Sequence, residues 1–149
     1  MATVWYTNAL YEMARGNLVL DAETLRVLLV QQGSSVGTED PDFLGGFSNL
    51  LEADAPNYAR RDVTNPAIIK NVVNGSVDFD ADDVAFPGLD QNSGGTNNMA
   101  AVVYASRGGD DPAQSIPVAY HDAGGFPFSG NGVDATVKWN QGGFARIKR

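Results

Sequence analysis

Residues 68–79 read Ile68-Ile-Lys-Asn-Val-Val-Asn-Gly-Ser-Val-Asp-Phe79, and this stretch decides the class of fold. Two short runs rich in β-branched residues flank the dipeptide Asn74-Gly75, and β-branched side chains favour strands. Asn and Gly readily adopt the positive φ angles that a type I′ turn requires. The stretch therefore predicts an antiparallel β-hairpin closed at Asn74-Gly75.

Residues 133–139 carry a second strand signal, because Val133, Ala135, Val137 and Trp139 alternate with polar residues. Alternate side chains of a strand point to opposite faces, so this segment predicts one buried and one solvated face, as in an antiparallel sheet. Other short apolar runs predict a central strand at 24–30 and further strands at 99–105, 115–121 and 143–147.

Two segments are predicted to be helical. Residues 7–15 place apolar side chains on one helical face, with Thr7 or Asn8 as the N-cap and Gly16 as the stop. Residues 43–51 have apolar side chains three and four positions apart, which predicts a second short helix.

A proline limits how one of the predicted strands can pair. Pro117 has no N–H to donate, so strand 115–121 is predicted to lie at a sheet edge or to begin pairing after this residue. The short strands are separated by segments rich in Gly, Pro, Asn and Asp. We therefore expect a mainly β fold, an antiparallel β-sandwich or partly open barrel with one or two short helices.

Composition limits the classes of function. A chain of 149 residues with 43% hydrophobic and 19% charged residues fits a single domain spanning residues 1–149. It has no cysteine, so disulfides and thiolate sites are excluded. The net charge of −8 disfavours direct contact with nucleic-acid phosphates. No apolar run approaches the ~20 residues that cross a bilayer, and residues 1–8 lack the basic start of a secretory signal. We expect no nucleic acid, membrane or cofactor as a partner.

Alternating carboxylates at Asp78, Asp80 and Asp82, with Asp83 beside them, are the first candidate for chemistry. Hard cations such as Ca²⁺ bind carboxylate oxygens. A calcium loop that starts at Asp78 needs Gly at its sixth position and Glu at its twelfth, where this chain has Asp83 and Leu89. Alternation with apolar residues instead predicts the solvated outer face of a strand. A structural cation is the alternative.

His121 is the only histidine, and His121-Asp122 resembles a fragment of an acid–base pair. No Gly-x-Ser-x-Gly elbow supplies a nucleophile, so a turn role at a strand end is expected. The glycines match neither nucleotide-binding motif. A carboxylate pair for hydrolysis stays open, because its separation is set in three dimensions. We assign no catalytic, cofactor-binding or metal-ligating residue and expect that the protein is not an enzyme.

We therefore expect the protein to work through surface contacts with other subunits. Acids gather between residues 78 and 134 whereas the C-terminus is basic, which suits a head-to-tail contact between subunits; a solvated surface is the alternative. Exposed aromatic side chains anchor interfaces. The loops 33–42, 89–98 and 124–132 are candidate contact segments. The candidate interface residues are Trp5, Tyr6, Phe126, Phe128, Arg146, Lys148 and Arg149.

Nearly the whole chain follows a recognisable order of segments. These segments are Tyr6-Thr-Asn-Ala9, Gly16-Asn-Leu-Val-Leu-Asp21, Thr24-Leu-Arg-Val-Leu-Leu-Val30, Asp42-Phe43-Leu44, Glu52, Tyr58-Ala-Arg-Arg61, Val77-Asp-Phe-Asp-Ala-Asp-Asp-Val-Ala-Phe86, Ala101-Val-Val-Tyr104, residues 116–120 and Val133-Asp-Ala-Thr-Val-Lys-Trp139. In this order they resemble a widespread group of small structural proteins of tailed bacteriophages.

The resemblance implies a virion component, a capsid decoration or cement protein that binds between major capsid protein subunits and stabilises the head. It implies the major capsid protein as partner, a homo-oligomer (trimer or dimer), and a place on the capsid surface after synthesis in the host cytoplasm. It carries no catalytic residue across. The alternative from the same resemblance is a neck, tail or fibre-associated protein with carbohydrate affinity.

Overall fold

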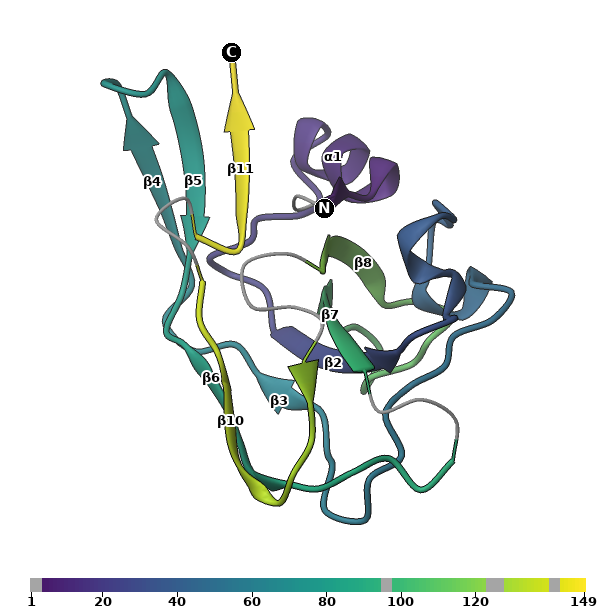
Figure 1. Cartoon of the computed structure of the whole chain (residues 1–149). Helices are drawn as coiled ribbons and strands as arrows, with labels where there is room; N and C mark the ends of the chain where they lie inside the picture. Colours follow the sequence, from purple (N-terminus) through teal and green to yellow (C-terminus); the bar gives the residue numbers. More distant parts are fainter. Residues whose placement is uncertain (1–3, 95–97, 123–127, 140–142) are drawn as a thin grey trace.

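The computed structural model describes residues 4–94, 98–122, 128–139 and 143–149 (Figure 1). Its main sheet has six strands, and every neighbouring pair is antiparallel. The order across the sheet is β1 (Val4–Trp5), β8 (Ile116–His121), β7 (Asn98–Ala105), β2 (Leu25–Gln31) and β3 (Arg61–Asp62), with β9 (Phe128–Ser129) also paired to β7. The strand predicted to be central is β2, which lies inside this sheet.

Two smaller antiparallel sheets complete the strand inventory of the described residues. One pairs β6 (Val84–Leu89) with β10 (Val133–Val137). The other has β5 (Ser76–Asp80) between β4 (Ala67–Asn71) and β11 (Ala145–Lys148). The expected mainly β, antiparallel fold is therefore confirmed.

Both faces of the main sheet are buried. On one face, Val27 of β2 belongs to a cluster with Phe86 and Phe144 from the smaller sheets, as expected for a β-sandwich. On the other face, Leu28 of β2 packs in a cluster with Leu44 from the long connection after β2. Because both faces are covered, β2 reads in the sequence as a continuous apolar run and not as an alternating one.

Helix α1 (Thr7–Ala14) confirms the first predicted helix, and it packs against β8. Its predicted cap is wrong. Tyr6 occupies the N-cap position without a side-chain cap, and the backbone N–H of Thr7 donates to Asp40 Oδ1 at 2.8 Å. A carboxylate from a distant loop thus satisfies an N–H that a local side chain was expected to satisfy.

The second predicted helix, over residues 43–51, is wrong. This segment forms only the 3₁₀ turn η2 (Leu44–Gly46). Gly45 packs against a neighbouring loop so closely that an added Cβ would lie 3.2 Å from the carbonyl oxygen of Pro112. The glycine therefore serves close backbone packing, and its low helix propensity outweighs the apolar spacing.

Strands β4 and β5 form the predicted antiparallel hairpin, but the predicted type I′ turn is wrong. The last ladder pair is Asn71 with Ser76, so four residues close the hairpin. Asn71 Oδ1 accepts a hydrogen bond from the N–H of Asn74 at 3.1 Å, and only Gly75 in the loop has a positive φ, of 62°. The Asn71 side chain thus stabilises a wider loop.

Strand β8 is not at an edge, since it lies between β1 and β7. Pro117 pairs opposite Tyr104, where the register between β7 and β8 shifts, and β1 pairs only with residues 119 and 120. The predicted edge position is wrong, whereas the alternative, that pairing begins after Pro117, holds on the β1 side. The irregular register and the short β1 together accommodate the missing N–H.

Strand β10 keeps the predicted alternation only in part. Val137 is buried, and Ala135 and Trp139 pack against the core. Val133 is 61% exposed. The register with β6 shifts between Val133 and Ala135, and such an irregularity turns the first residue away from the buried face.

Candidate functional site

A three-stranded sheet projects from the body of the molecule beside the C-terminus (Figure 1). We call it the arm, and it consists of β4, β5, β11, the hairpin loop 72–75 and residue 149. Within the part of the chain that the structure describes, β4 and β11 each pair on one side only, with β5. Outer strands with unpaired N–H and C=O groups can pair with another chain.

One face of the arm is apolar. The ladders place Val77 of β5 opposite both Lys70 of β4 and Ile147 of β11. Directly paired residues share a face, as do residues two positions apart, so Ile68 and Phe79 lie on this face too. Phe79 is buried at the base of the arm, whereas Val77 and Ile147 are exposed further out. The apolar face thus continues the core outward into solvent.

The exposed apolar surface is greatest at the tip. In the hairpin loop, Val72 is 75% exposed and Val73 is 96% exposed. Ile68 and Ile147 are also exposed on the apolar face, whereas the exposed Ile69 pairs with Asp78 and lies on the opposite face. Contiguous apolar surface of this kind is uncommon on soluble monomers and marks contact sites. The tip of the arm is therefore the candidate contact surface.

A hollow of about 460 Å³ lies at the outer end of the arm. Its apolar wall includes Val77 and Ile147, and its charged lining comes from Lys70, Lys148 and Arg149. Basic groups around apolar side chains favour a partner that combines apolar and acidic groups.

The opposite face of the arm is polar and holds an internal ion pair. Asp78 lies there with its side chain only 6% exposed, and Arg146 donates to it through Nε at 2.6 Å and Nη2 at 3.0 Å. Ser76 Oγ donates to the same carboxylate at 2.8 Å. The hydrogen bonds from Arg146 lower the pKa of Asp78 to about 2. The expectation of a solvated outer face is therefore wrong at Asp78.

Two predicted interface residues make contacts within the molecule instead. The Trp5 ring lies edge-on to Phe79 with ring centroids 5.3 Å apart, and its Nε1 donates to the carbonyl oxygen of Arg146 at 2.9 Å. Tyr6 is 2% exposed, and its hydroxyl donates to the carbonyl oxygen of Val36 at 2.6 Å. Tyr6 is therefore a core residue, which corrects its assignment to an interface.

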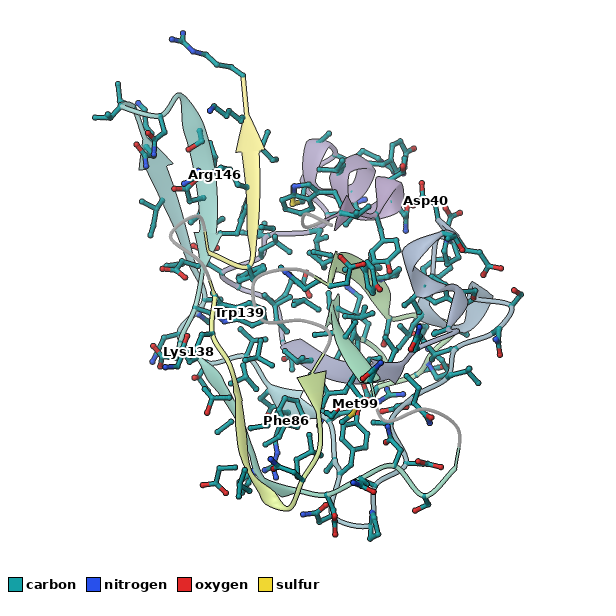
Figure 2. All side chains as sticks on the ribbon, in the orientation of Figure 1. Asp40, Phe86, Met99, Lys138, Trp139 and Arg146 are labelled. Atoms are coloured by element: carbon teal, nitrogen blue, oxygen red, sulfur yellow. The ribbon has the colours of Figure 1, made fainter. Side chains whose placement is uncertain are left out.

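The remaining predicted interface residues differ in their surroundings. Arg146 is committed to the internal pair with Asp78 (Figure 2). Lys148 and Arg149 are exposed at the end of the arm. Phe126 lies outside the described residues, and Phe128 is placed only by its backbone, in β9 opposite Met99.

Sequence reasoning missed the apolar tip of the arm. It treated the run from Ile68 to Val73 as strand and assigned none of it to a contact. A signal was present, because Val72 and Val73 directly precede Asn74-Gly75 and turn residues are normally solvated. Two valines beside a turn have no core within reach.

His121 is packed inside the molecule at the end of a strand. It is the last residue of β8, it is buried, and its ring lies 5.3 Å from that of Trp139. Burial lowers the pKa of His121 to about 4. The expected place at a strand end is confirmed, and the neutral imidazole packs against Trp139. The turn expected after it falls on residues 123–127, which lie outside the described residues.

Two half-buried carboxylates of the body, Glu52 and Asp110, form ion pairs with arginines. Arg60 Nε and Nη2 each donate to Glu52 at 2.8 Å, and Arg60 Nη1 donates to Asp110 at 3.3 Å. Arg26 Nη1 and the Tyr104 hydroxyl also donate to Asp110, at 2.8 Å and 2.7 Å. The network fastens the segment before β3 to the main sheet, since it links that segment to β2 and β7.

Among the described residues, no three His, Asp or Glu side chains are grouped to hold a metal ion. Asp82, from the predicted carboxylate run, accepts a hydrogen bond from Asn65 Nδ2 at 2.6 Å. Of the helices that the structure describes, none has the length and apolar character to cross a bilayer.

The arm is therefore the feature to compare with known proteins. Comparisons of the chain with protein-family models, with curated proteins and with solved structures find no match.

Proposed function

We propose that this protein is a phage virion structural protein, a capsid decoration or cement protein that binds between major capsid protein subunits and stabilises the head. The observation that supports the proposal is the arm, whose apolar face is exposed towards the tip and whose outer strands β4 and β11 each pair on one side only among the described residues. The order of sequence segments, which resembles small structural proteins of tailed phages, supplies the virion context.

The energetics of a repeated shell suit such an arm. A lasting protein contact buries at least about 1,000 Å² in total with good complementarity. On a symmetric shell each copy makes the same contacts repeatedly, so modest contacts add up through avidity. A projecting sheet is well placed for this role, because it reaches beyond the body that carries it (Figure 1).

The proposal is tested by the number of copies per virion, measured by quantitative mass spectrometry. A cement protein is present in hundreds of copies, whereas a neck, tail or fibre-associated protein of the alternative kind is present in about a dozen or fewer, as set by the symmetry of those parts. A low copy number or absence from the particle contradicts the proposal.

A matched pair of variants ties the particle role to the arm. Val73→Asp places a charge at the apolar tip, and Val133→Asp places the same charge at an exposed valine of β10. We expect Val73→Asp to lower occupancy of the particle at least about tenfold, as loss of a central interface residue does, and Val133→Asp to leave it unchanged. If both variants occupy the particle equally, the arm does not make the contact with the capsid.

A further inference from the structure

A second hollow lies on the body, in the connection after β2. It has a volume of about 580 Å³ and is lined by Asp42, Phe43, Gly45, Gly46, Pro112 and Ala113. The Phe43 side chain is 43% exposed. The hollow therefore combines an exposed aromatic ring with proline and alanine side chains and a glycine floor.

The walls of this hollow are tied together by backbone hydrogen bonds. The N–H of Leu44 donates to the carbonyl oxygen of Ser115, and the N–H of Gly45 donates to that of Pro112, each at 2.8 Å. An added Cβ at Gly46 would lie 2.7 Å from the Cβ of Pro41, so the floor is already closely packed. The hollow is preformed, which reduces the entropy lost on binding.

Acidic residues lie in or next to the segments that line the hollow. Asp42 lines it, Asp111 adjoins Pro112, and Asp40 lies two positions before Asp42. The backbone N–H of Ala113 donates to Asp111 at 2.9 Å, which lowers the pKa of that carboxylate and keeps it ionised. The hollow on the body is therefore lined by negative charge, whereas the hollow at the end of the arm is lined by the positive residues Lys70, Lys148 and Arg149.

We infer that the arm binds a second copy of this chain, with its apolar tip seated in the acidic hollow at Phe43 and Pro112 of the next copy. The inference rests on the proposed function because it takes the arm as the docking surface. It adds that a second copy of this chain is what the arm binds. Branched apolar side chains at the tip, Val72 and Val73, meet an apolar hollow, and cations around the tip meet acids around the hollow.

Charge complementarity selects this pairing of surfaces. Two copies each carry a net charge of −8 and repel one another in general. Contact between the basic arm and the acidic hollow is an arrangement that brings opposite charges together.

The two surfaces lie apart on the molecule. Figure 2 shows Arg146 in the arm and Asp40, near the hollow, on opposite sides of the molecule in this view. The arm and the hollow of one copy can therefore contact different neighbours. The contact is head to tail, and it gives a ring if the rotation between copies closes and a chain of copies if it does not.

The test uses size-exclusion chromatography with light scattering on the full chain. The unmodified protein is expected to associate as its concentration rises. Val73→Asp, which alters only the tip, and Phe43→Asp, which alters only the hollow, are each expected to weaken association at least about tenfold. Val133→Asp is the control and is expected to associate like the unmodified protein.

Mixing the two variants distinguishes a head-to-tail contact from other geometries. The tip variant keeps an intact hollow and the hollow variant keeps an intact tip, so an equimolar mixture is expected to form one contact and stop at a pair of chains. A mixture that stays monomeric overturns the inference, as does an unmodified protein that is monomeric at every concentration.

A charge exchange repeats the test at exposed residues, in case Phe43→Asp does not fold. Asp42→Lys and Lys148→Asp each place like charges across the contact and are expected to remain monomeric. Their mixture is expected to associate, because both contacts between unlike variants join opposite charges at positions 148 and 42. Association of either variant alone to the level of the unmodified protein overturns the inference.

Failure of the inference and failure of the proposed function are distinguishable. If the isolated protein is monomeric and Val73→Asp still abolishes particle binding, the arm binds a capsid subunit: the inference is wrong and the proposed function stands. If the mixed variants pair but the virion lacks the protein, the inference stands and the proposed function is wrong.

Discussion

At the scale of single residues, Gly143 occupies the most constrained backbone position at the base of the arm. Its φ is 75°, and an added Cβ would lie 2.1 Å from the carbonyl oxygen of Phe79. The next residue, Phe144, donates its N–H to that same oxygen at 2.8 Å. The chain can enter β11 along this path only because residue 143 has no side chain.

We therefore expect Gly143→Ala to destabilise the protein by more than the cost of a positive φ alone, which is about 1–2 kcal/mol for a residue with a Cβ. Gly109→Ala is the control, because Gly109 also has a positive φ, of 71°, but an added Cβ there meets no atom within 4 Å. Urea unfolding measures the difference. Equal losses for the two variants would show that the close approach to Phe79 carries no cost.

At the scale of elements, the arm depends on one ion pair on its polar face. Arg146 of β11 and Asp78 of β5 join the two strands through side chains as well as through the ladder. The pKa of Asp78 is lowered, so its ionised form contributes stability above the unfolded-state pKa and loses that contribution as the pH falls through the folded-state value.

Arg146→Met is expected to lower the melting temperature at pH 7 by several degrees, because it leaves the Asp78 carboxylate without its cation. The deficit should narrow as the pH falls from 3.8 to about 2, the range between the ordinary pKa of Asp78 and the lowered one. Lys148→Met, on the same strand and face, is the control and should change little, since Lys148 is exposed. Thermal melts across this range provide the measurement, and a deficit independent of pH contradicts the assignment.

Prediction from sequence succeeded at this scale wherever local signals were strong. The hairpin, the first helix and strands β2, β7 and β8 of the main sheet follow from β-branched runs, apolar spacing and turn residues. The predicted helix at 43–51 failed because Gly45 packs against Pro112, a contact between distant segments. The buried position of Asp78 likewise depends on Arg146, 68 residues away.

At the scale of the whole molecule, the candidate site could be predicted only in part. The basic C-terminus and the loop 33–42 were identified from charge and composition, and Lys148, Arg149 and Asp42 belong to these segments. Which apolar residues remain exposed is set by packing, so Val72, Val73 and Phe43 could not be told from core residues by pattern alone. Tyr6 shows the converse, since its place near the terminus did not prevent burial.

Opposite charge on the two surfaces makes association sensitive to salt. Raising NaCl from about 0.1 M to about 1 M shortens the Debye length from about 10 Å to about 3 Å. We expect the association constant to fall several-fold over this range, measured by sedimentation equilibrium. An association constant that rises steadily with salt would indicate a contact held by apolar burial alone.

Both tryptophans of the chain lie at the joints between the arm and the body. The Trp5 indole donates to Arg146 of β11, and the Trp139 indole donates to the carbonyl oxygen of Asp82, in the bend between β5 and β6, at 3.0 Å. Swinging or melting of the arm would break both bonds and expose both rings to water. Intrinsic fluorescence, which moves to longer wavelength when an indole is hydrated, is thus an unlabelled optical reporter of arm motion.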